Sequence, residues 1–132
     1  MAQTNSSLQR WEPIFLSILR IVVGLLLLEH GTQKLFHFPP PDRAMHGLPP
    51  LMMVAAWLEL AGGLLLVLGL FTRLVAFVVA GEMAVAYFMA HAPASLYPIK
   101  NHGEFAVALC FVFLYLAVAG GGRLSVDAIW RG

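Results

Sequence analysis

Residues 13–36 read PIFLSILRIVVGLLLLEHGTQKLF, a run in which most side chains are apolar. At ~1.5 Å per residue, a helix of this run is long enough to cross the ~30 Å hydrocarbon core of a bilayer. The run nevertheless contains Arg20 and Glu29, and a charge at membrane depth is costly. Such residues usually face the interior of a helix bundle, pair with one another and mark a site.

Three more apolar runs follow, at about residues 50–71, 74–90 and 103–119. Backbone groups in lipid must hydrogen-bond within their own segment, so each run is expected to be α-helical. The proline-rich residues 37–50 and the very short link at 71–73 connect neighbouring runs as turns. The sequence therefore predicts an all-α fold, an integral membrane antiparallel four-helix bundle that forms a single domain over residues 1–132.

The composition supports a membrane protein and excludes several functions. The chain is 60% hydrophobic and 11% charged, with a mean hydropathy of +0.81, whereas soluble domains carry roughly a quarter charged residues. A net charge of +1 gives no indication of nucleic-acid binding. The single cysteine, Cys110, rules out a disulfide within the chain and a self-contained dithiol relay. No secretory signal is visible, so the first run is expected to remain as a membrane anchor in the lipid bilayer.

The distribution of basic residues between the connections predicts the orientation. Loops on the cytoplasmic side of a membrane usually carry more Lys and Arg. Four such residues lie on the side of the termini and three on the other, which favours both termini in the cytoplasm. The two groups are Arg10, Arg73, Arg123 and Arg131 against Lys34, Arg43 and Lys100.

Two layers of polar residues emerge when depth is estimated from helical rise. Arg20, Glu59 and Glu82 are expected to share a layer inside the bundle, with the Arg20 guanidinium in contact with at least one of the two carboxylates. Glu29 lies on the opposite side of its helix from Arg20, so it faces the surface or a different neighbour. The second layer is expected near the other membrane face; it contains His30, Lys34, His91, Asn101 and Glu104. On the second run, glycines beside Glu59 allow close approach between helices.

The ordered motifs resemble those of the DoxX family. In this chain, Arg20-Ile-Val-Val-Gly24 followed by His30-Gly31-x-x-Lys34 resembles the first-helix signature of the family. Glu59-x-x-Gly62-Gly63 resembles its second helix. Asn101-x-Gly103-Glu104, and the glycines at 120–122 before Ser125 and Asp127, resemble its last helix and tail. The resemblance implies a small four-helix protein of the bacterial inner membrane. The resemblance also implies a redox role, since some relatives take part in passing electrons from thiosulfate to quinone. Glu29 is not part of the family pattern.

Three functions remain open at this point. The first is a subunit or accessory factor of a quinone-linked redox system, in which a quinone is the cofactor and a partner subunit carries the electrons, because the chain has no CxxC, haem-attachment or dinucleotide motif. The second is transport of a small solute or proton, for which a homo-oligomer would be needed to form a pore. The third is a structural or assembly role, with the buried charges fixing helix register. No metal site is assigned, since no helical His-x-x-x-His pair occurs.

Overall fold

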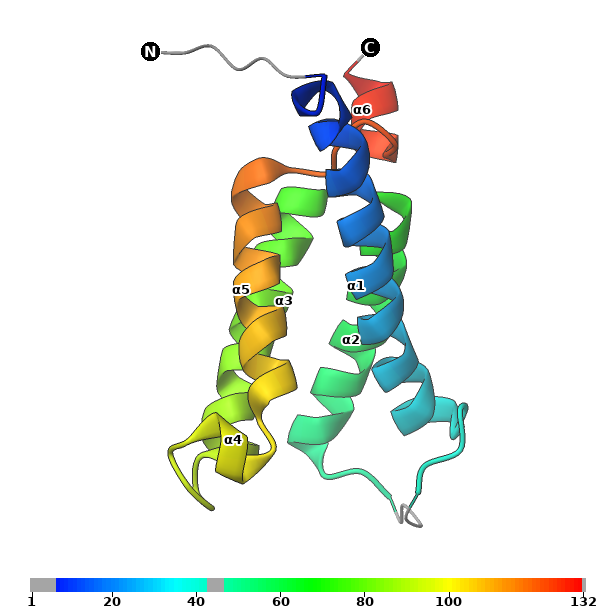
Figure 1. Ribbon diagram of the computed structural model, residues 1–132. Helices are drawn as coiled ribbons and strands as arrows, with labels where there is room; N and C mark the ends of the chain where they lie inside the picture. Colours follow the sequence, from blue (N-terminus) through cyan, green and yellow to red (C-terminus); the bar gives the residue numbers. More distant parts are fainter. Residues whose placement is uncertain (1–6, 43–46, 132) are drawn as a thin grey trace.

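The computed structural model describes residues 7–42 and 47–131, so Arg43, which entered the orientation count, lies outside it. Every regular element in these ranges is helical (Figure 1). The elements in chain order are a 3-10 turn (Gln9–Trp11), α1 (Glu12–Phe36), α2 (Pro50–Leu68), α3 (Thr72–Ala86), a π-helical turn (Tyr87–His91), α4 (Pro98–Asn101), α5 (Glu104–Ala119) and α6 (Val126–Trp130). Two of the long helices end earlier than predicted: α2 stops at Leu68 instead of residue 71, and α3 stops at Ala86 instead of residue 90, where a π-helical turn continues the chain to His91.

The long helices form two closely packed pairs. Helix α1 lies along α2, α3 lies along α5, and contacts between α2 and α3 join the pairs. Consecutive long helices run in opposite directions (Figure 1). One end of the molecule, called here the terminal end, holds the start of α1, the α2–α3 link and α6. The opposite end, the loop end, holds the α1–α2 connection and α4.

Glycines set both the spacing and the register of α1 against α2. A Cβ added at Gly31 would lie 2.6 Å from the Leu60 nitrogen, and one at Gly63 would lie 2.7 Å from Leu28 Cα. The two backbones therefore touch at these points, as the glycines on α2 predicted. This register places the loop-end half of α1 beside the middle of α2.

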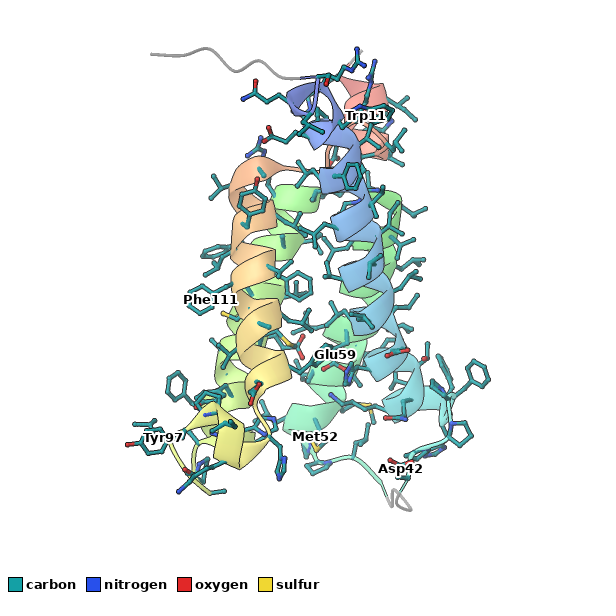
Figure 2. All side chains as sticks on the ribbon, in the orientation of Figure 1. Trp11, Asp42, Met52, Glu59, Tyr97 and Phe111 are labelled. Atoms are coloured by element: carbon teal, nitrogen blue, oxygen red, sulfur yellow. The ribbon has the colours of Figure 1, made fainter. Side chains whose placement is uncertain are left out.

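The core between the pairs is apolar, and so is the outer surface. Leu27, Leu66, Phe113 and Leu116 are fully buried at its centre. Large apolar side chains also cover the outside; Phe111 points away from the molecule (Figure 2) and is 66% exposed. Three helical segments are long and apolar enough to cross a membrane, and the α5 helix is apolar but shorter; the three are Gln9–Phe36, Pro50–Leu68 and Thr72–His91.

Candidate functional site

Lys34 and Glu59 form an ion pair in the loop-end half of the molecule. The Lys34 Nζ donates to Glu59 Oε1 at 2.7 Å and to Oε2 at 2.9 Å. The Glu59 side chain is 4% exposed and that of Lys34 is 20% exposed. Over residues 7–42 and 47–131 this is the one ion pair. A buried carboxylate with both oxygens bound to one ammonium is held in a fixed position.

Glu82 on α3 completes the cluster. Glu82 lines the same cavity as Lys34 and Glu59. Its Oε1 atom is buried and has no hydrogen-bond partner within the described part of the chain. Since a buried polar atom without a partner costs free energy, Glu82 Oε1 is an acceptor that a proton, a water molecule or a ligand would satisfy. The cluster thus brings one ammonium and two carboxyl groups together from three helices.

A cavity of about 340 Å³ lies against this cluster, between α2 and α3. Exposed residues from α2, α3 and the π-helical turn line it, among them Val54, Val78 and Met89, so it opens on the outer surface of the molecule. Apart from Lys34, Glu59 and Glu82 its lining is apolar: Leu51, Met52, Val54, Ala55, Leu58, Val78, Gly81, Val85, Ala86, Met89 and Ala90. The arrangement suits an amphipathic molecule with a small polar head and an apolar tail.

A second, smaller cavity adjoins the same lysine. It measures about 160 Å³ and is lined by Lys34, Leu35, His37, Gly47, Leu48 and Met53. It lies beside the α1–α2 connection at the loop end. Lys34 therefore stands between the larger cavity and the end of the molecule.

The predicted contact of Arg20 with Glu59 or Glu82 is wrong. Arg20 is 1% exposed and lies at the terminal end, where its Nε donates to the Leu66 carbonyl at 2.8 Å and its Nη2 to the Leu124 carbonyl at 2.8 Å. It also donates to the carbonyls of Val67 and Gly121. The glycine register places Glu59 level with Gly31, about 16 Å along α1 from Arg20. The Arg20 guanidinium is thus bound by backbone carbonyls of the last turn of α2 and of the tail, and not by a carboxylate.

The predicted second layer does not form one site. Lys34 belongs to the cluster with Glu59, whereas the His30 ring stacks on Phe105 with ring centroids 5.4 Å apart. Glu104 is exposed at the first residue of α5. These three positions lie near the same end of the molecule but have different neighbours.

Asn101 and His91 fasten the connection between the π-helical turn and α5. The buried Asn101 amide donates to the Tyr87 hydroxyl at 3.1 Å and to the Ser95 carbonyl at 2.7 Å, and its Oδ1 accepts from the Gly103 N–H at 2.8 Å. The His91 Nδ1 lies 3.0 Å from the Asn101 carbonyl oxygen. Because these groups satisfy one another and backbone atoms, they hold the loop in place.

Asp127 is a partner that the sequence did not reveal. Its two carboxylate oxygens accept from the N–H groups of Phe71, at 2.8 Å, and Thr72, at 2.9 Å, at the start of α3. Partial burial pushes the pKa of the Asp127 carboxyl up, but these two N–H donors and the charge of Arg131 outweigh it and hold the pKa below its usual value. Helix starts favour a carboxylate, but nothing in the sequence spacing indicates that one comes from the tail.

The described residues contain no group of three or more His, Cys, Asp or Glu side chains placed to hold a metal ion. The ammonium of Lys34 and the carboxyl groups of Glu59 and Glu82 offer acid–base chemistry and hydrogen bonding.

Comparisons with known proteins place the chain in a family. A sequence model of the DoxX family matches residues 15–92. An "Uncharacterized protein" of Haemophilus influenzae is 39% identical over 127 residues, covering 92% of this chain and 95% of the relative. The chain therefore belongs to the DoxX family of membrane proteins, as its motifs predicted.

Two further relatives carry names. The Bacillus subtilis protein named "Putative oxidoreductase CatD" is 30% identical over 116 residues, which cover 83% of this chain and 82% of the relative. The Escherichia coli "Inner membrane protein YqjF" is 26% identical over 133 residues, which cover 92% and 96%. No solved structure matches the chain. A membrane location agrees with the family and with the apolar helices.

Proposed function

We propose that this protein crosses the bacterial inner membrane as an antiparallel four-helix bundle and binds an isoprenoid quinone in the cavity between α2 and α3, as a subunit of a quinone-linked redox system. The observation that carries the proposal is an apolar cavity that opens on the outer surface and ends on Lys34, Glu59 and Glu82. A quinone has the matching shape, since its head accepts hydrogen bonds and its tail is hydrocarbon. The name of the Bacillus subtilis relative, an oxidoreductase, also supports this class.

The cluster supplies what a quinone head group requires. Two of the three N–H groups of Lys34 point to Glu59, which leaves one for a quinone carbonyl. Reduction of a quinone to a quinol takes up two electrons and two protons. The carboxyl group of Glu82 lies at the cavity as a proton donor or acceptor, and Lys34 links it to the smaller cavity at the loop end. The electrons must come from a partner subunit, because the sequence carries no motif for an electron carrier.

We also propose that both termini lie in the cytoplasm. Loops on the cytoplasmic side usually carry more Lys and Arg. Four basic residues lie on the side of the termini and three on the other; the four are Arg10, Arg73, Arg123 and Arg131. The proposed quinone site accordingly lies in the half of the membrane that faces away from the cytoplasm.

Transport through a single chain has less support. The polar groups around Arg20 and those around Lys34 lie at opposite ends, and the apolar core that includes Leu27, Leu66 and Phe113 fills the space between them. In the described residues no chain of polar side chains connects the two ends through this core. We therefore expect protons to exchange between Glu82 and the loop end without crossing to the terminal end.

Labelling by a quinone analogue tests the proposal. The purified chain in lipid nanodiscs is exposed to a photoreactive isoprenoid quinone, and labelled peptides are identified by mass spectrometry. We expect label on α2 and α3, in competition with unlabelled quinone. Gly81 lines the cavity and has open space where a side chain would project, so Gly81→Leu should fill the cavity and lower labelling at least tenfold.

The matched control adds a leucine elsewhere on the lipid-facing surface. Ala108 is exposed on α5, away from the cavity, so Ala108→Leu should leave labelling unchanged. Glu82→Gln removes the proton-exchanging group with little change of shape and should slow quinol formation when a reduced partner is supplied. Equal labelling of the wild-type chain and Gly81→Leu would contradict the proposal.

A further inference from the structure

We infer that the outward face of α1 around Glu29 docks a transmembrane helix of a second, different membrane protein, which brings a lysine or arginine side chain to the Glu29 carboxylate. The inference stands on the depth, the exposure and the unmatched charge of Glu29. It concerns a residue that the quinone cavity does not contain.

The register between α1 and α2 gives the depth of Glu29. Gly63 meets Leu28, and Gly31 meets Leu60, so Glu29 lies level with the stretch of α2 between Leu60 and Gly63. That stretch begins ten residues after Pro50, about 15 Å along a helix whose 19 residues span about 28 Å. Glu29 on α1 therefore lies level with the middle of α2, deep within the segment that crosses the hydrocarbon.

Glu29 points outward at this depth. It is exposed, and it shares an outward face of α1 with Val22 and Leu25, which are each 49% exposed. Its carboxylate makes no hydrogen bond or ion pair with any residue in the described ranges; the one contact of Thr32 with Glu29 uses the backbone carbonyl. A glutamate side chain is too short to reach water from this position, unlike the long stems of Lys and Arg.

A carboxylate in this position needs a partner from outside the chain. Charged side chains within membrane spans are costly in lipid, and nearly all of them face protein or water and pair with another group. Toward the terminal end the surrounding face is apolar, with Val22 and Leu25. Toward the loop end it continues with Thr32 and Gln33, whose side chains donate to the Glu29 and Pro39 backbone carbonyls and supply no cation. A neighbouring protein helix that carries a cation would satisfy the charge and bury the apolar side chains around it.

A second copy of this chain offers no such cation. In the described part of the long helices Arg20 is buried among carbonyls, Lys34 is bound to Glu59, and Arg73 lies in the first turn of α3. A symmetric pair of chains joined through α1 would place one Glu29 against the other or against hydrocarbon. Charge complementarity thus favours a different protein. The docking rests on the proposed membrane crossing but not on the quinone site, whereas the expectation that this partner carries the electrons rests on both.

Site-directed photocross-linking tests the docking. A photoreactive amino acid replaces Leu25, one turn from Glu29, and the full chain is irradiated in the membranes of the cells that produce it. We expect an adduct with one membrane protein whose cross-linked peptide is a transmembrane segment containing Lys or Arg. Glu29→Leu should lower the adduct at least tenfold, and Glu104→Gln, which removes an exposed carboxylate at a helix end, should not change it.

A charge exchange makes the test specific. Glu29→Lys should abolish the adduct, and replacing the partner's cation by glutamate in the same cells should restore it. Adducts with lipid alone, an adduct of twice the 14.4 kDa chain, or an adduct that Glu29→Leu leaves unchanged would overturn the inference.

Two measurements separate this result from the quinone proposal. The purified Glu29→Leu chain should unfold at the same or a higher temperature than the wild type, because the variant removes a charge from lipid without breaking an internal contact. It should also keep full labelling by the photoreactive quinone. A wild-type chain that forms the adduct but takes no quinone label would overturn the proposed function and leave the docking intact.

Discussion

At the scale of single residues, the Lys34–Glu59 pair allows its structural and functional roles to be separated. Lys34→Met leaves the Glu59 carboxylate, 4% exposed, without its cation, and should destabilise the protein by about 3 kcal/mol. Replacing both partners with apolar residues, Lys34→Met with Glu59→Leu, removes the uncompensated charge and should bring stability within about 1 kcal/mol of the wild type. Denaturant unfolding in detergent micelles measures all three chains.

The double variant is the informative one. If the pair serves the quinone site, the doubly substituted chain should fold normally and yet lose quinone labelling. Additive destabilisation by the two substitutions would contradict the direct coupling that the 2.7 Å contact indicates. Full labelling of a stable double variant would assign the pair a structural role alone.

Arg20 shows what residue types alone can predict. An arginine within an apolar run is expected to be buried, and it is. Its partners were predicted wrongly because they are backbone carbonyls, which every residue carries and no sequence pattern marks. Glu59 differs, since its partner is a side chain four positions after His30 in the motif His30-Gly31-x-x-Lys34. Pairing Lys34 with Glu59 requires the register of α1 against α2. Depths counted from the ends of the apolar runs did not give this register.

At the scale of helices, glycine contacts predict which substitutions the α1–α2 pair tolerates. A Cβ at Gly31 would lie 2.6 Å from the Leu60 nitrogen, so Gly31→Ala must push the two backbones apart and should cost about 1–3 kcal/mol. Gly81 on α3 meets nothing within 4 Å, so Gly81→Ala should be neutral or stabilising by up to about 1 kcal/mol. Thermal unfolding of both chains in the same detergent provides the comparison, and equal effects would argue against the close contact.

The sequence predicted the positions of the long helices better than the irregular turn at the end of α3. Apolar run length sets where the long helices lie, and prolines and glycines set where they stop. The π-helical turn at Tyr87–His91 was not predicted, because its Ala92 N–H to Tyr87 carbonyl bond, at 2.8 Å, forms beside the contacts of Tyr87 with Asn101 and Leu96. Such a shift in the ladder depends on distant residues, so local propensity gives no sign of it.

At the scale of the whole molecule, the two ends differ in structure: one holds ionisable side chains beside cavities, and the other is closed by the tail. The loop end holds the ionisable cluster and its cavities. The terminal end is closed by the tail: Ser17 Oγ donates to the Gly121 carbonyl at 3.0 Å and accepts from the Leu124 N–H at 2.9 Å. The Asp127 N–H donates to the Gly69 carbonyl at 3.0 Å. The tail thus joins the start of α1 to the α2–α3 link and fixes the end of the bundle away from the proposed quinone site.

The closure at the terminal end should depend on acid. Because the pKa of Asp127 is lowered in the folded protein, its contribution to stability is present above the unfolded value of about 3.9 and is lost as the pH falls through the folded value. Fluorescence of Trp130, whose ring lies 6.0 Å from that of Phe71, reports on the tail when Trp11 and Trp57 are replaced by Phe. The Asp127→Ala variant should weaken the closure by about 1 kcal/mol at neutral pH. Trp130 emission of the chain that keeps Asp127 should stay constant from neutral pH to about 4 and then shift toward the emission of this variant. Glu12→Gln, an exposed acid at the same end, should leave the curve unchanged. A wild-type chain that already matches Asp127→Ala at pH 7 would show that the carboxylate does not hold the start of α3.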